Sequence, residues 1–255
     1  MDKGKNIYFA SDFHLGAPTH RESLERERLI VRWLEEIQPQ AEAVYLLGDI
    51  FDFWFEYRKA VPRGFVRFLG KLAEFTDKGI PVHFFTGNHD LWIFDYLPEE
   101  VGLMIHQGPY EVTLMDKRFY LAHGDGLGPG DGTFKFLKKI FTSPLAQWLF
   151  GRIHPNLGIA LAHKWSLSSR NVHEIPEDFR GEEQEMLVQH ARQMLEKNHF
   201  DYLIFGHRHM AIDYPLNASS RYINLGDWIF HNTYGEFDGK DFQLKQYTPN
   251  NTGSR

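Results

Sequence analysis

The segment AVYLLGD, residues 43–49, ends a short apolar run with a glycine and an aspartate. A run of this length and composition is typical of a buried strand, and Gly48 permits a tight turn directly after it. In open α/β sheets, ligands bind at the carboxyl ends of the strands. The segment therefore predicts a central strand that delivers Asp49 to a binding site.

Similar segments lie on both sides of this one. NIYFA at 6–10 and PVHFFTG at 81–87 are also short apolar strand candidates. Apolar residues at helical spacing separate the three, over 21–37 and around 65–75. The order strand–helix–strand–helix–strand predicts right-handed crossovers and a parallel sheet.

The second half of the chain contains further strand candidates. Two of them flank Asp116–Lys117 and predict a hairpin. The full set is EVTLM (111–115), FYLAHG (119–124), DYLIFG (201–206), RYINLG (221–226) and DFQLKQY (241–247). We therefore expect one α/β (α+β) domain over residues 1–255, with either one mixed sheet or two packed sheets and helices outside.

Composition narrows the class of protein. The 255 residues carry a net charge of −6, so the basic footprint of a nucleic-acid-binding protein is absent. There is no cysteine, which excludes disulfides and thiolate metal sites and fits a reducing compartment. The apolar run before Ser11 is too short for a signal peptide, and no run reaches the ~20 residues of a membrane span. We expect a cytoplasmic protein.

Metal-ligating residue types follow apolar strands at five places in the chain. Each place alone is a weak signal, because GD and GNHD are common turn sequences and a chance H-x-H pair is unremarkable among 14 histidines. All five together predict a metal site. The residues are Asp12 and His14; Asp49; Asn88, His89 and Asp90; His123 and Asp125; His207 and His209.

These ligand types also narrow the choice of metal. Asp, Asn and His without Cys suit Mn²⁺, Fe or Zn²⁺. Six or seven ligands are too many for one catalytic ion that must keep an open position. They suffice for two divalent ions about 3.5 to 4 Å apart that share one carboxylate. Asp49 is the predicted bridge.

Residues 126–175 differ from the rest of the chain. Six Lys or Arg and one Asp over 126–173 give this stretch a net charge of +5, so the remainder carries −11. The plain interpretation is a pair of amphipathic helices with solvated lysines. The alternative is a helical cap that offers apolar surface and cations to an anionic, lipid-like ligand. An aromatic run in this stretch comprises Phe134, Phe136, Phe141, Trp148 and Phe150.

The order D-x-H, GD, GNHD, H-GD, GH-x-H resembles the calcineurin-like metallophosphoesterase superfamily. The resemblance implies a β-sandwich of mixed sheets flanked by helices. It also implies that His89 acts as general acid or contacts phosphate, oriented by Asp90. The implied ligands are Asp12, His14, Asp49 and His209 for one metal, and Asp49, Asn88, His123 and His207 for the other.

A narrower resemblance is carried by SDFHLG, GDIFDFWF, HGDGL and NLGDW. These stretches are similar to the Mn²⁺-dependent members of the superfamily that split the pyrophosphate of UDP-2,3-diacylglucosamine into lipid X and UMP. This implies a lipid-linked nucleotide substrate, attack by a metal-bound hydroxide, and peripheral contact with the cytoplasmic face of the inner membrane. The cap cations expected to pair with the substrate are Lys135, Lys138, Lys164 and Arg170.

One departure keeps other substrates open. The best-known members of that group have Arg where this chain has His89. A phosphoesterase for soluble nucleotides or phosphoproteins is the first alternative, and a non-catalytic scaffold is a remote one. A nuclease fits poorly with the charge of −11 outside the cap. We expect no nucleic-acid partner, and no obligate protein partner is evident.

Overall fold

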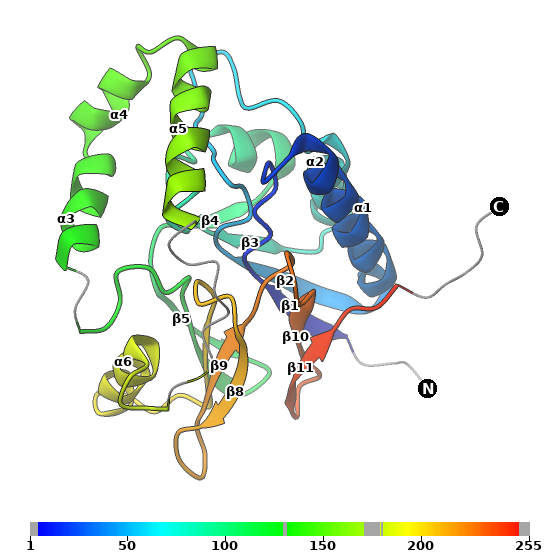
Figure 1. Ribbon diagram of the computed structural model, residues 1–255. Helices are drawn as coiled ribbons and strands as arrows, with labels where there is room; N and C mark the ends of the chain where they lie inside the picture. The colour runs from blue at the N-terminus through cyan, green and yellow to red at the C-terminus, as the bar shows by residue number, and fades with distance from the viewer. Residues whose placement is uncertain (1–4, 130–131, 171–178, 180, 250–255) are drawn as a thin grey trace.

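The computed structural model describes residues 5–129, 132–170, 179 and 181–249, without the side chains of 133, 134 and 163–170. Two sheets pack face to face with helices on their outer sides (Figure 1). The first sheet has six strands. In spatial order they are β11 (Phe242–Gln246), β10 (Thr233–Phe237), β1 (Asn6–Ala10), β2 (Ala41–Leu47), β3 (Val82–Phe85) and β4 (Met104–His106). Strands β1 to β4 are parallel, and β10 pairs antiparallel with both β1 and β11.

The second sheet has five strands. In spatial order they are β5 (Tyr110–Leu114), β6 (Lys117–Leu121), β7 (Tyr202–Phe205), β9 (Arg221–Leu225) and β8 (Ala211–Pro215). The three central strands are parallel, and the edge strands β5 and β8 pair antiparallel with their neighbours. Both sheets are therefore mixed.

Alternation along β1 shows how one strand serves two cores. Ile7 and Phe9 face the second sheet, whereas Tyr8 and Ala10 face the helices. Side chains of a strand point alternately to opposite faces, so a strand buried on both faces is apolar throughout. A third cluster fills the space between the second sheet and helix α6 (Met186–Leu195). The layer order is helix, sheet, sheet, helix.

Helices α1 (His20–Ile37) and α2 (Val66–Asp77) cover the outer face of the first sheet. Helix α1 begins at Thr19, whose hydroxyl accepts a hydrogen bond from the Glu22 amide at 3.3 Å. This is the usual way in which Thr satisfies an otherwise unpaired N–H at a helix start. Two short helical turns, η1 (Gln38–Gln40) and η2 (Leu97–Val101), lie between the main elements.

Three helices stand apart from both of these helical layers, at the upper left of Figure 1. They are α3 (Gly132–Phe141), α4 (Pro144–Phe150) and α5 (Pro155–Arg170). Aromatic side chains join them to the rest of the protein. Trp92 donates a hydrogen bond from its ring nitrogen to the Phe141 carbonyl at 2.8 Å, and the Phe150 ring lies 4.6 Å from the Trp92 ring.

Most elements lie where the sequence predicts them, and the alternative of two packed sheets is correct. Strands β4, β8 and β10 were not predicted, and the hairpin turn is Met115–Asp116 rather than Asp116–Lys117. Within the described residues, no helix combines the length and the apolar character needed to cross a membrane.

Candidate metal centre

The loops that follow β1 and β2 run side by side at the carboxyl end of the first sheet. The Asp12 amide donates to the Gly48 carbonyl at 3.0 Å, and the His14 amide donates to the Asp49 carbonyl at 2.9 Å. This pairing continues the parallel register of the strands beyond their last residues. It brings Asp12, His14 and Asp49 to one edge of the sheet, as the sequence predicts.

Five of the predicted ligands have a left-handed backbone. This region of φ and ψ is uncommon for residues other than glycine and costs of order 1–3 kcal/mol each. A left-handed residue directly after a strand turns the chain sharply, so that ligands close in sequence can face the same point. The residues and their φ angles are Asp12 (55°), His14 (45°), Asp49 (52°), His207 (68°) and His209 (53°).

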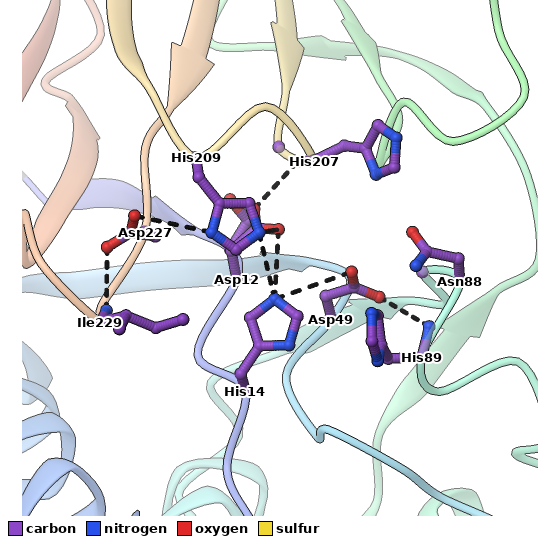
Figure 2. Close-up of polar contacts among 12 residues, drawn as sticks. Asp12, His14, Asp49, Asn88, His89, His207, His209, Asp227 and Ile229 are labelled. Atoms are coloured by element: carbon purple, nitrogen blue, oxygen red, sulfur yellow. Dashed lines mark hydrogen bonds and ion pairs between the residues drawn. The ribbon is translucent and has the colours of Figure 1, made fainter. Parts of the chain in front are cut away.

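One cluster consists of Asp12, His14 and His209 (Figure 2). The Nε2 atoms of the two histidines lie 3.2 Å apart. Asp12 Oδ1 is 3.4 Å from Nε2 of His209 and 3.9 Å from Nε2 of His14. Asp12 and His14 are fully buried and His209 is partly exposed. Three ligand-type atoms therefore converge from the loop that follows β1 and from the β7–β8 loop.

A second cluster consists of Asp49, His123 and His207. His123 Nε2 lies 3.3 Å from Asp49 Oδ2 and 3.3 Å from Oδ1 of Asn88. The other ring nitrogen of His123 is 2.7 Å from the Leu47 carbonyl, which can only accept a hydrogen bond. Nδ1 is therefore the donor, and Nε2 is directed at Asp49 and Asn88.

Asp49 belongs to both parts of the site. Its Oδ2 faces His123 and also lies 3.9 Å from His14 Nε2, while its Oδ1 accepts a hydrogen bond from the His89 amide at 2.9 Å. Burial alone would raise the pKa of this carboxyl group, but the imidazoles of His123, His89 and His14 outweigh it and lower the pKa well below the ordinary value. Asp49 is therefore held as an anion at the centre of the site.

The residues present fit a divalent cation. Asp12 Oδ1 is buried, and within the described residues it accepts no hydrogen bond although two imidazole nitrogens approach it. Buried carboxylate oxygens are ordinarily paired, so such an oxygen requires a positive partner. Carboxylate, amide and imidazole ligands without thiolate suit Mn²⁺, Fe or Zn²⁺.

His89 has a different carboxylate partner from the one expected. Its Nδ1 lies 3.0 Å from the Asp52 carbonyl and 3.7 Å from Asp52 Oδ1. Asp90 is fully buried and accepts hydrogen bonds from the amides of Gly87 at 2.7 Å and Ile50 at 2.8 Å. The adjacent residues His89 and Asp90 therefore have different partners. The Asp90 carboxylate binds backbone amides, whereas the His89 ring lies beside Asp52.

At two positions only glycine fits, because side-chain atoms of the candidate ligands lie very close to its Cα atom. A Cβ atom on Gly48, whose φ is +84°, would lie 2.7 Å from the His123 ring, and one on Gly206 would lie 2.6 Å from Asp12 Oδ2. Real Cβ contacts are not that short. These glycines therefore let the strand ends approach the ligand side chains, as expected from their positions in the sequence.

The predicted cap cations are only partly described. Lys138 reaches toward the site and pairs with the buried Asp125 carboxylate at 2.5 Å. Lys135 donates to the Gly128 carbonyl at 2.6 Å. Lys164 and Arg170 lie in α5, but their side chains lie outside the described residues, as do the Phe134 side chain and residues 130, 131 and 171–175 of the expected cap.

One residue of the site was not singled out from the sequence. Asp227 is fully buried, and its Oδ2 lies 3.6 Å from Nδ1 of His209. The sequence does contain a pattern that could have identified it. Asp227 follows the apolar strand β9 and a glycine, in the same way as Asp49 follows β2 and a glycine.

Comparisons with known proteins agree with this geometry. The family model of the calcineurin-like phosphoesterases matches residues 5–211. A Porphyromonas gingivalis protein named UDP-2,3-diacylglucosamine hydrolase is 41% identical over 94% of this chain and 96% of its own length. Proteins of the same name from Aeromonas hydrophila (30% identical, 87% and 90% covered) and Vibrio parahaemolyticus (26%, 96% and 98%) are also similar. The chain therefore belongs to the calcineurin-like phosphoesterase family and is a metal-dependent hydrolase.

Proposed function

We propose that this protein hydrolyses the pyrophosphate bond of UDP-2,3-diacylglucosamine, giving lipid X and UMP. The observation that carries the proposal is the 41% identical relative of that name, which matches along 96% of its own length. The site and the helices beside it contain groups suited to the two ends of such a substrate, an anionic diphosphate and two acyl chains.

The diphosphate end would be bound at the metal centre. In this proposal Asp12, His14, Asp49 and His209 hold one Mn²⁺, and Asp49, Asn88, His123 and His207 hold a second. Bound cations of this kind activate a water molecule and stabilise charge on phosphate oxygens. The support is the convergence of ligand-type atoms in two groups of three: those of Asp12, His14 and His209, and those of Asp49, His123 and His207, lie within 4.8 Å of one another.

His89 is the proposed proton donor. The Asp52 carbonyl, 3.0 Å from Nδ1, accepts the proton of that nitrogen, and Nε2 is the nitrogen proposed to face the substrate. The side chain is 13% exposed, so a substrate can reach it while neighbouring groups fix its orientation. As an imidazolium, with a proton on each ring nitrogen, His89 would donate from Nε2 to a phosphate oxygen or to the leaving group. Asp90 supports this loop through the backbone.

The acyl chains would be bound by residues 126–175, which we interpret as a substrate cap within a single domain. Several large apolar side chains of α3, α4 and α5 are exposed: Phe136, Ile140, Leu145, Trp148, Leu149, Leu157 and Leu161. Covering such side chains with hydrocarbon is worth about 0.8 kcal/mol per buried CH₂. Lys135, Lys138, Lys164 and Arg170 are the proposed partners of the substrate's negative charge.

The same exposed side chains would let the cap touch a bilayer. A substrate with two acyl chains resides in a membrane, so an enzyme that takes it needs an apolar contact surface. We infer peripheral contact with the cytoplasmic face of the inner membrane. Sedimentation with vesicles of anionic phospholipid should recover the protein, and charged substitutions at Leu145 and Trp148 should reduce that recovery.

The test of the function is hydrolysis by metal-stripped protein reconstituted with Mn²⁺, Fe²⁺ or Zn²⁺. The substrates are UDP-2,3-diacylglucosamine in detergent micelles and UDP-N-acetylglucosamine, which keeps the diphosphate and lacks the acyl chains. We expect UMP and the diacyl sugar phosphate from the first, with Mn²⁺ as the best metal, and little reaction with the second. Equal turnover of both would contradict the proposal.

A further inference from the structure

Asp227 organises the turn that follows β9. Its Oδ1 accepts hydrogen bonds from three consecutive amides, those of Ile229 at 2.9 Å, Phe230 at 2.7 Å and His231 at 3.2 Å. The side chain is fully buried. Three amide donors fix both the orientation of the carboxylate and the direction of its second oxygen.

The second oxygen faces two imidazoles. Oδ2 lies 3.1 Å from Nδ1 of His231, which is 43% exposed. It also lies 3.6 Å from Nδ1 of His209 (Figure 2). On the other side of the His209 ring, Nε2 faces Asp12 and His14. The His209 ring therefore lies between the Asp227 carboxylate, which has its hydrogen-bond donors, and Asp12 Oδ1, which has none within the described residues.

The turn is also fastened to the strand that carries Asp12. The Trp228 amide donates to the Asp12 carbonyl at 3.2 Å. The buried Trp228 ring packs against Phe13 at 5.4 Å and Trp33 at 5.0 Å between ring centroids. Asp227 is thus placed relative to Asp12 by backbone and by core packing, and not by its contact with His209.

We propose that Asp227 is a positioning residue that keeps the proton of His209 on Nδ1, so that the Nε2 lone pair is directed at the space beside Asp12 and His14. A carboxylate only accepts hydrogen bonds, so the nitrogen facing it must carry the proton. A metal ligand needs the opposite nitrogen without one. The inference rests on the proposed function in one respect, that His209 binds a cation.

Asp227→Asn is the decisive variant. The asparagine carbonyl can still accept from the three amides, whereas its NH₂ group takes the place of Oδ2 and donates toward the imidazoles. The His209 proton is then expected on Nε2. His231→Gln is the matched control, because it changes the other imidazole at Oδ2 and leaves the contact between Asp227 and His209 in place.

Two measurements are needed. The first is the tautomer of His209 in the metal-free protein, read from ¹⁵N–¹H correlations of the imidazole at alkaline pH. The second is Mn²⁺ affinity by calorimetry. We expect Asp227→Asn to move the proton to Nε2 and to weaken Mn²⁺ binding about 10- to 100-fold, as for other groups that orient a ligating histidine. His231→Gln should change neither by more than about threefold.

The outcomes separate the two claims. An unchanged His209 tautomer in a folded Asp227→Asn protein would overturn the inference, as would a reversed tautomer with unchanged Mn²⁺ affinity. A wild-type protein that binds no Mn²⁺ but has His209 protonated at Nδ1 would instead contradict the proposed metal centre. If Asp227→Asn does not fold, Asp227→Glu is measured in its place. This variant keeps the carboxylate and should retain the wild-type His209 tautomer if the inference holds.

Discussion

His89 lies against Asp52 and not against Asp90, the carboxylate that follows it in sequence. Its Nδ1 is 3.0 Å from the Asp52 carbonyl, whereas the Asp90 carboxylate accepts from the amides of Gly87, Ile50 and Phe51. Burial, and then the nearby Asp49 charge, raise the pKa of Asp90 to about 7. Two carboxyl groups close in space therefore have separate tasks, and substitutions should separate them.

The first prediction concerns this separation. His89→Ala should lower kcat by roughly 10²- to 10⁴-fold, the usual effect of removing a general acid. Asp90→Asn should instead lower the free energy of unfolding by about 1–3 kcal/mol, because a buried N–H loses its acceptor. Steady-state kinetics and urea unfolding measure the two effects. If Asp90→Asn lowered kcat as much as His89→Ala with stability unchanged, Asp90 would be the partner of His89 after all.

The second prediction is that metal binding stabilises the fold. Five of the proposed ligands have strained backbones and Asp12 Oδ1 lacks a donor, so the site should favour a cation strongly. Mn²⁺ at 100 times its Kd should add about 2.7 kcal/mol to the free energy of unfolding, and chelation should remove it. Thermal melts of wild type and Asp49→Asn provide the comparison. A Tm that responds to Mn²⁺ equally in both proteins would show that the ion binds elsewhere.

The third prediction uses two glycines with opposite surroundings. Gly206→Ala places a Cβ 2.6 Å from Asp12 Oδ2 and should weaken Mn²⁺ binding, because Asp12 must move. Gly70 lies inside α2 with nothing within 4 Å of an added Cβ. Gly70→Ala should therefore stabilise the protein by about 0.5–1 kcal/mol without changing metal affinity. Calorimetry and unfolding curves of both variants test this, and normal Mn²⁺ affinity in Gly206→Ala would contradict the close-packed site.

The fourth prediction tests the cap. Leu145 on α4 and Val66 on α2 are both exposed, at 67% and 74%, but only Leu145 belongs to the helices proposed to bind acyl chains. Leu145→Glu should raise KM for the diacyl substrate and leave hydrolysis of a soluble aryl phosphodiester unchanged. Val66→Glu should affect neither. Equal loss on both substrates in Leu145→Glu would point to a damaged active site instead of a lost lipid contact.

The fifth prediction is a pH dependence of stability away from the site. Burial, and then the neighbouring His106, lower the pKa of His83 to about 4, against about 6.5 in an unfolded chain. Between these values the unfolded chain binds more protons, so stability falls as pH drops from 6.5 toward 4. His83→Phe, which keeps a ring against Tyr45, should flatten this slope. The measurement is the free energy of unfolding of both proteins between pH 4 and 6.5. An equal pH dependence in wild type and His83→Phe would contradict the lowered pKa of His83.

The sequence predicted the elements that depend on local pattern. Strands β1, β2 and β3 are largely apolar on both faces, and each is followed within three residues by a candidate ligand, so the ends could be aligned without coordinates. The three-residue β4 is too short for any periodicity. Strand β10 contains Gly235 and alternates between buried and half-buried positions, which weakens its apolar signal.

The relationships that escaped prediction depend on loop conformation or on distant pairing. Whether Asp52 or Asp90 faces His89 is decided by the left-handed turn at Asp49 and by amides of two loops. Asp227 reaches His209 only because β9 lies between β7 and β8 in the second sheet. Neither relationship has a fixed spacing in the chain.

The strands on either side of β1 also determine when the candidate metal site can form during synthesis of the chain. Ile7 pairs with Phe237 on one side and with Ala43 on the other, so this strand is interior in the sheet. On the ribosome, the loop bearing Asp12 and His14 emerges early but stays unsupported on one side until residues 233–237 have been synthesised. A nascent chain halted before that point should therefore be inactive, and the candidate metal centre should assemble only after residues 233–237 have been synthesised.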